Sequence, residues 1–194
     1  MKRLLLAGVS MCALAGLSSR AEAAPRIHDG FYMQLTTGLG YYNVSFDPDS
    51  SISGVTTPFG IMMGGTITPG FAIGGGLFAD YSSSPTVKMG DAEVDLPGAQ
   101  MLLGIGVHAD YYLKPEGGLH FTGFLGWGGL EETEGAGGSD PTGLVIGLGG
   151  GYDWWIADEW SAGVLGKIDY APLKFNDASF TTTAFSVLGT LTWH

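Results

Sequence analysis

Residues 101–127 read MLLGIGVHADYYLKPEGGLHFTGFLGW and contain two alternating segments separated by a short polar turn. In each segment, large apolar side chains recur at every second position, with glycine or polar residues between them. A period of two is the pattern of a β-strand whose two faces meet different surroundings. The turn, Lys114-Pro115-Glu116-Gly117, is too short to join parallel neighbours. We therefore expect an antiparallel hairpin here.

The same alternation recurs from Gly30 to the end of the chain and defines eight segments. One face of each segment is apolar, and the opposite face is mostly Gly, Thr and Ser with a few charges. The apolar faces are Phe31, Met33, Leu35, Leu39, Tyr41; Phe59, Ile61, Met63, Ile67; Phe71, Ile73, Leu77, Tyr81; Met101, Leu103, Ile105, Val107, Tyr111; Leu119, Phe121, Leu125, Trp127; Leu144, Ile146, Leu148, Tyr152, Trp154; Trp160, Ala162, Val164, Ile168, Tyr170; and Phe185, Val187, Leu191, Trp193.

The connections between these segments alternate in length. Short turns are predicted at 68–70, 114–117 and 157–159, and longer polar loops at 46–55, 82–98, 131–142 and 172–180. Outer-membrane barrels have short periplasmic turns, longer outside loops and an even number of strands. The sequence therefore predicts an all-β fold, an eight-stranded antiparallel up-and-down transmembrane β-barrel with both termini in the periplasm of a Gram-negative cell.

Aromatic residues stand near the ends of the apolar faces, and pairs such as Phe71 and Tyr81 lie ten residues apart. Ten residues of tilted strand rise roughly 25 Å, the height of the apolar band of such barrels. Aromatic rings concentrate at both membrane interfaces. A soluble barrel with aromatic core anchors is the alternative, but it would place charged residues outward. The predicted girdle consists of Phe31, Tyr41, Phe71, Tyr81, Tyr111, Trp154, Trp160, Tyr170 and Trp193.

The start of the chain has the pattern of an export signal. Lys2 and Arg3 precede an apolar stretch that is shorter than the roughly 20 residues needed to span a bilayer. Ala21-Glu22-Ala23 is a small-x-small cleavage site. We expect residues 1–23 to be a signal peptide and residues 24–194 to be the barrel domain. Cys12 lies inside the signal and follows Met11, where a lipoprotein signal has a small residue, so lipidation is not expected.

The composition of the exported part excludes several classes of function. Removing residues 1–23 leaves 5 of 8 basic and 18 of 19 acidic residues, a net charge of −13, which disfavours nucleic-acid binding. No cysteine remains, so neither disulfides nor thiolate chemistry is available. Glycines such as Gly104, Gly106 and Gly147 fall on the face opposite the apolar one, where they would relieve crowding in a narrow lumen. None of them opens a phosphate-binding loop, and we expect no cofactor and no metal site.

The last strand, Phe185-Ser186-Val187-Leu188-Gly189-Thr190-Leu191-Thr192-Trp193-His194, alternates and ends in an aromatic residue followed by one further residue. With the eight-segment pattern, it makes residues 30–194 resemble the small outer-membrane β-barrel family typified by the OmpA membrane domain and OmpX. The resemblance implies a monomer that contacts outer-membrane lipid and lipopolysaccharide. It also implies that the barrel-assembly machinery reads the terminal strand, although His194 departs from the family's aromatic end. We do not expect the cell-wall tethering that a peptidoglycan-binding domain gives to full-length OmpA.

Ionisable residues on the lumen face form two predicted groups. Asp110 and His120 can pair across a hairpin, and Lys167 and Asp169 share a face opposite Asp80. Buried charges persist only when paired, so we expect a polar plug that fills the lumen. A gated pore or a proton path is the alternative. The predicted lumen network consists of Asp80, His108, Asp110, His120, Asp153, Lys167 and Asp169.

Enzymes of this scaffold, lipid A deacylases and palmitoyltransferases, need a histidine beside a serine at the outer-leaflet boundary. Ser82, Ser83 and Ser84 are predicted there without a histidine, because His108 and His120 face the lumen at the periplasmic end and His28 and His194 lie at the termini. We therefore expect no enzyme and assign no catalytic residue.

The predicted outer loops are acidic. They would be solvated or would bridge divalent cations to lipopolysaccharide phosphates. The hypothesis is a structural or surface-interaction role, with a narrow transporter for a small hydrophobic molecule, or a lipid A-modifying enzyme, as alternatives. The loop charges are Asp47, Asp49, Asp91, Glu93, Asp95, Glu131, Glu132, Glu134, Asp140 and Asp177, against Lys88 and Lys174.

Overall fold

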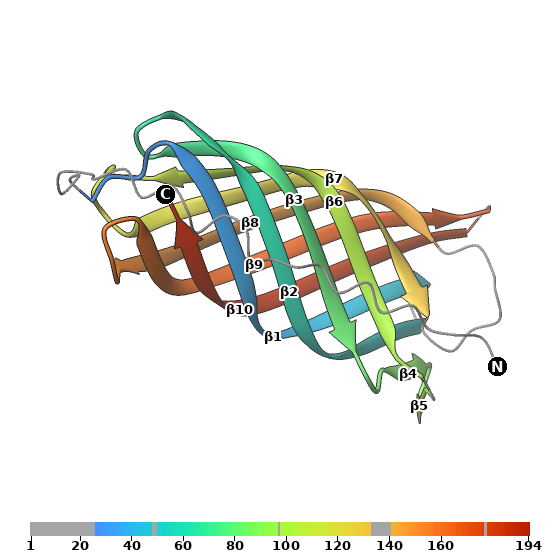
Figure 1. The fold of residues 1–194 in the computed structure, drawn as a ribbon. Coiled ribbons are helices and arrows are strands. Elements are labelled where there is room, and N and C mark those ends of the chain that lie inside the picture. Colours follow the sequence, from blue (N-terminus) through green and yellow to red (C-terminus); the bar gives the residue numbers. More distant parts are fainter. Residues whose placement is uncertain (1–25, 48–49, 97, 133–140, 177) are drawn as a thin grey trace, which may run out of the picture.

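A single antiparallel sheet makes up almost all of the computed structural model, which describes residues 26–47, 50–96, 98–132, 141–176 and 178–194. Eight strands curl into a closed barrel (Figure 1). They are β1 (Phe31–Asp47), β2 (Ser50–Thr68), β3 (Phe71–Ser82), β6 (Gln100–Tyr112), β7 (Leu119–Glu132), β8 (Thr142–Trp155), β9 (Trp160–Phe175) and β10 (Ala178–Trp193). Among the described residues, no helix is long and apolar enough to cross a membrane.

The barrel closes because β1 pairs on both sides. Met33 lies opposite Met63 of β2 and opposite Trp193 of β10. Each of the eight strands therefore has two neighbours, so that backbone N–H and C=O groups find partners along both of its sides. This closure confirms the predicted eight-stranded antiparallel fold.

The predicted alternation of faces is also confirmed. On β9, the Val164 side chain is 50% exposed while the next residue, Leu165, is fully buried. The apolar faces assigned from the sequence point outward on all eight strands, and the residues between them point into the lumen. A side-chain period of two fixes this assignment, since a slip of one residue would turn every side chain to the other face.

The two ends of the barrel differ. At one end, called here the turn end, lie the three short connections and His194 (Figure 1). At the other, the hairpin end, two short strands, β4 (Thr86–Met89) and β5 (Ala92–Asp95), project from the barrel, and β4 pairs with Ser50–Ser53 of β2. The three predicted short turns match the connections at the turn end.

The predicted loops at the hairpin end were partly wrong. Residues 46–55 and 172–180 are mostly strand, because β1 and β2 are separated only by residues 48–49, and β9 continues to Phe175. Within 82–98, the chain forms the β4–β5 hairpin. The physical reason is that these polar stretches keep inward apolar residues such as Ile52 and Leu173, which are buried, and pair Phe46 with Phe180 at 5.2 Å between ring centroids. Most of the predicted loop 131–142 lies outside the described residues.

Candidate functional site

The lumen at the turn end is crossed by a hydrogen-bond network centred on Asp153. Its carboxylate accepts hydrogen bonds from the hydroxyls of Thr190 at 2.6 Å, Tyr112 at 2.9 Å, Thr192 at 3.3 Å and Ser161 at 3.4 Å. These donors come from β6, β9 and β10, so one carboxylate on β8 ties together strands on different sides of the barrel. A buried carboxylate is tolerated only when its oxygens are satisfied in this way.

Asp110 is the second anchor of this turn-end network. It accepts a hydrogen bond of 2.6 Å from the Tyr32 hydroxyl, and its Oδ1 lies 2.7 Å from Nδ1 of His120. The other ring nitrogen of His120 lies 3.8 Å from Asp153 Oδ1. The imidazole thus stands between two carboxylates, and the Asp110–His120 contact across the β6–β7 hairpin has the geometry that the sequence suggested.

His28 and His194 cover this network at the barrel mouth. Nε2 of His28 donates to the Gly117 carbonyl at 2.8 Å, so Nδ1 of the neutral ring can only accept. His194 lies 2.9 Å from that Nδ1 and must therefore donate to it. The His28 ring also stacks on Tyr112 and Trp155, at 3.5 and 4.6 Å between centroids. The sequence had placed both histidines only at the chain ends, and the structure buries them.

Burial sets the protonation of the two capping histidines. Desolvation lowers the pKa of His28 to about 4, although Asp153 and Asp110 nearby act in the opposite direction. Desolvation likewise lowers the pKa of His194 to about 3, and the facing His28 and His120 add to the effect. Both rings are therefore neutral near pH 7, which leaves Nδ1 of His28 unprotonated and able to accept the hydrogen bond from His194.

A second layer, the charge layer, lies on the hairpin-end side of this network. Nζ of Lys167 lies 2.9 Å from Oδ1 of Asp169 and 4.1 Å from the centroid of the Phe78 ring. Asp80 is also buried in the lumen, and its Oδ2 has no hydrogen-bond partner among the described residues. His108, 1% exposed, contacts the Thr122 hydroxyl at 3.3 Å and is the remaining member of the predicted set. All seven predicted lumen residues are thus buried inside the barrel.

Towards the hairpin end the lumen is apolar, which the sequence reasoning missed. Eleven buried residues form a hydrophobic cluster there: Tyr42, Val44, Ile52, Phe78, Leu102, Phe124, Leu130, Val145, Ala171, Leu173 and Ala184. The available signal was that segments such as 101–103 are apolar at both parities, which indicates burial on both faces. Lumen glycines make room for this packing, since a side chain at Gly104 would overlap the Phe78 ring and one at Gly147 would meet Asp169 Oδ1 at 2.5 Å.

The outer wall carries the predicted aromatic residues on its apolar face. Six of them are well exposed, and three, Phe71, Trp160 and Trp193, are half-buried because they pack on neighbouring rings. Trp160 stacks on Trp193 at 5.8 Å and Phe71 meets Tyr111 edge-on at 6.2 Å between centroids. The exposed six are Phe31, Tyr41, Tyr81, Tyr111, Trp154 and Tyr170.

The hairpin end exposes the acidic side chains Asp91, Glu93, Asp95 and Glu131. Lys88 lies 3.9 Å from Glu93 across the β4–β5 hairpin. Asp49, Glu134, Asp140 and Asp177 lie outside the described residues, as does the predicted signal peptide. Over the described ranges, no three His, Cys, Asp or Glu side chains are arranged to hold a metal ion.

Serine and histidine side chains meet only at the turn end within the described part of the chain. Ser161 Oγ lies 3.2 Å from His194 Nε2, but Ser161 is fully buried and also donates to Asp153. Ser82 is buried and Ser83 and Ser84 are exposed, and no contact joins them to a described histidine. Because Ser161 is buried, its hydroxyl is not accessible to a substrate in this arrangement.

No protein-family model matches the sequence, and no curated protein matches it either. Solved structures do match the fold. Neisserial surface protein A shares 14% identity at a TM-score of 0.63, over 84% of this chain and 96% of that one. Ail of Yersinia pestis, in complex with the heparin analogue sucrose octasulfate, shares 10% identity at a TM-score of 0.54, over 84% of this chain and 99% of that one. The outer membrane protein OprG of Pseudomonas aeruginosa shares 12% identity at a TM-score of 0.52, over 88% of this chain and 100% of that one. The chain thus has the fold of the small outer-membrane β-barrels.

Proposed function

We propose that this barrel resides in the bacterial outer membrane, with its turn end in the periplasm. There it would serve as a closed scaffold whose acidic hairpin end meets partners outside the cell. The observation that supports the proposal is a set of three successive layers of buried side chains in the lumen: the turn-end network, the charge layer and the apolar cluster. Its role is then structural or interactive rather than that of an open channel.

The outer wall supports membrane insertion. Large apolar side chains such as Val187, 69% exposed, and Trp127, 60% exposed, cover it on every strand of the barrel. Soluble monomers rarely expose a contiguous apolar patch of more than a few hundred Å². Hydrocarbon is the solvent in which such a surface is stable, and a closed barrel leaves no unpaired backbone edge inside it.

The closed lumen is supported by the turn-end network. Tyr32, Asp110, His120 and Asp153 are at most 2% exposed and join strands across the barrel, while Met62 and Ala72 of β2 and β3 pack against Tyr32. Side chains from all eight strands therefore meet at this level. Opening an axial path would strand buried carboxylates without partners, which costs several kcal/mol per ion.

The acidic hairpin end sets the class of partner. Ail was crystallised with a sulfated polyanion, but the exposed Asp91, Glu93, Asp95 and Glu131 of this chain would repel one. A cationic partner, or divalent cations that bridge to lipopolysaccharide phosphates, complements these carboxylates. The exposed carboxylates among the described residues are enough to favour a positively charged partner.

Single-channel recording tests the closed lumen. We expect the folded barrel in a planar lipid bilayer to give no steady conductance at neutral pH. As a positive control, the double variant Tyr32→Ala, Tyr112→Ala removes two rings from the turn-end network and should raise conductance. A steady open channel in the unmodified protein contradicts the proposal, and recovery of the protein from the soluble periplasmic fraction contradicts its location.

One observation favours a second function, a narrow transporter for a small hydrophobic molecule: the lumen is apolar towards the hairpin end. Liposomes with and without the barrel separate the two functions. Uptake of a fluorescent alkane derivative that depends on the barrel, and that is blocked by enlarging Ala184 to Phe, supports transport. Equal uptake in both preparations supports the closed scaffold.

A further inference from the structure

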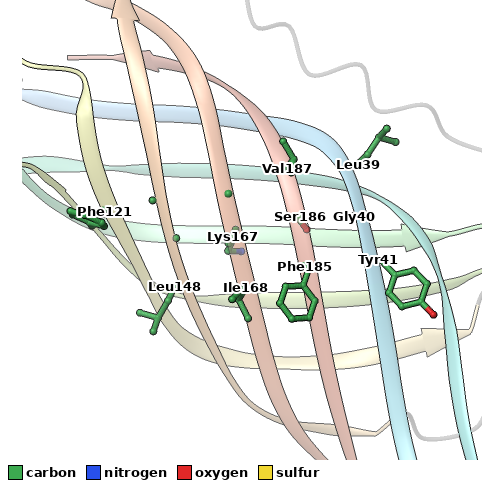
Figure 2. Close-up of a pocket in the computed structure, with 13 residues that line it drawn as sticks. Leu39, Gly40, Tyr41, Phe121, Leu148, Lys167, Ile168, Phe185, Ser186 and Val187 are labelled. Carbon is green, nitrogen blue, oxygen red and sulfur yellow. The ribbon is translucent and has the colours of Figure 1, made fainter.

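A shallow groove of about 800 Å³ lies on the outer wall of the barrel, away from the lumen layers (Figure 2). Its exposed walls are apolar side chains from five adjacent strands, β7 to β10 and β1. Figure 2 shows them as separate projections, with Phe121 at one end and Tyr41 at the other. The one charged residue along the groove, Lys167, turns its side chain into the lumen and pairs there with Asp169.

The groove follows the register of the sheet. One row of directly opposed residues runs Phe121, Gly150, Gly166, Val187, Leu39. The adjacent row runs Leu148, Ile168, Phe185, Tyr41. Four strand spacings of about 4.8 Å make the first row about 19 Å long. Since strands in such barrels tilt by about 40°, the row climbs about 12 Å from the turn end towards the hairpin end.

The floor of the groove is backbone, because Gly150 and Gly166 lie side by side where the neighbouring strands carry large side chains. Packing within the barrel does not explain these two glycines. A Cβ at Gly166 would have its nearest neighbour at 3.8 Å, and one at Gly150 would touch the Phe121 ring at 3.4 Å, both ordinary contacts. Glycine inside a strand also weakens it. The open floor is therefore a property of the outer surface.

We propose that this groove binds one acyl chain of an outer-membrane lipid. The inference rests on the proposed membrane location and adds a specific lipid site to it. The groove is continuous with the apolar wall that hydrocarbon covers, and Tyr41 ends it at the predicted aromatic girdle, where lipid backbones lie. An acyl chain that enters the groove beside Tyr41 would run obliquely over the two floor glycines towards the turn end and reach Phe121. The outer wall of a second barrel is convex, so it would rest on the side chains that border the groove and leave the glycine floor uncovered.

The test compares two glycine-to-leucine variants on the lipid face. Gly166→Leu fills the groove. Gly75→Leu is the matched control, because Gly75 also faces outward and a Cβ there would have no neighbour nearer than 4.0 Å, but it lies on β3, outside the groove. Each barrel is reconstituted with palmitoyl-oleoyl-phosphatidylethanolamine, extracted into detergent and weighed by native mass spectrometry.

We expect the unmodified protein and Gly75→Leu to retain one phospholipid, and Gly166→Leu to lose it. Equal retention in both variants, or no retained lipid in the unmodified protein, overturns the inference. A dimer in the unmodified protein that Gly166→Leu converts to monomer also overturns it, in favour of a second copy. If the protein fractionates with the outer membrane and is silent in conductance but retains no lipid, the lipid site fails while the proposed function stands.

Discussion

Lys167 shows how a single residue depends on its surroundings in the lumen. Its ammonium is buried, lies 2.9 Å from Asp169 and faces the Phe78 ring, while Asp80 occupies the same layer. Facing lipid instead, a lysine at mid-depth would cost about 2–4 kcal/mol. Inside, it is stable only because a carboxylate accompanies it, so neither partner can be changed alone without cost.

We expect Lys167→Met to lower the free energy of unfolding by about 3–5 kcal/mol, because it leaves Asp169 buried without its cation. Adding Asp169→Asn should restore part of the loss. Lys174→Met is the control, since Lys174 is exposed on the same strand. Urea titration in detergent micelles measures the difference. Equal stability of Lys167→Met and Lys174→Met would show that the ion pair contributes nothing.

The capping histidines predict a loss of stability in mild acid. In the folded barrel the pKa of His28 is lowered to about 4 and that of His194 to about 3, whereas both are 6.5 as unperturbed values. The unfolded chain therefore binds more protons between pH 6.5 and about 3, and stability is full above pH 6.5 and falls as the pH drops.

Between pH 7 and pH 5 we expect the barrel to lose about 2–4 kcal/mol through these two residues. The double variant His28→Gln, His194→Gln should show a flatter dependence over the same range. Tryptophan fluorescence during guanidinium unfolding, repeated at several pH values, provides the measurement. Parallel curves for the two proteins would assign the pH dependence to other groups.

At the scale of the strands, the alternating pattern was sufficient to predict the barrel wall but not its ends or its interior. Outward faces were predicted correctly because large apolar residues stand at every second position of these segments. The start of β2 was predicted as part of the loop 46–55 because Ser50, Ser51 and Ser53 make it polar, although Ile52 and Val55 in the same stretch are β-branched and compatible with strands. The apolar lumen cluster was missed because Leu102 and Phe124 have the parity assigned to polar residues.

Leu173 tests whether these extensions belong to the stable fold. It is 1% exposed in the hairpin-end cluster, beyond the point where the sequence predicted a loop. Leu173→Ala should destabilise the barrel by about 2–5 kcal/mol, as truncation of a packed core residue does. Lys174→Ala, its exposed neighbour, should change stability by less than about 0.5 kcal/mol. A loop-like Leu173 would instead tolerate alanine as well as Lys174 does.

For the whole molecule, closure matters more than any single contact. Each of the eight barrel strands is paired along both sides, so unfolding cannot begin by fraying from a free edge. The candidate site depends on the same closure, because Tyr32 of β1 and Asp110 of β6, three strands apart in the sheet, meet across the lumen. Sequence reasoning found the Asp110–His120 and Lys167–Asp169 pairs, which are close along one hairpin or one strand. It could not find the Asp153 contacts, which depend on how the barrel curves.

We expect the folded protein to resist sodium dodecyl sulfate at room temperature and to change its apparent mass on a gel only after boiling. The reason is that all strand pairs must open together before detergent can reach the backbone. Densitometry of heated and unheated samples measures the folded fraction. Identical migration of the two samples would contradict a closed barrel.

Pairing between β1 and β10 also determines when the molecule can form. Met33 pairs with Trp193, 160 residues later, so the barrel cannot close until the final strand has been synthesised. Until then β1 presents an open edge of the kind that recruits other chains. Contacts so distant along the chain also form slowly. The barrel can therefore close only as a late event, after the whole of β10 is available to pair with β1.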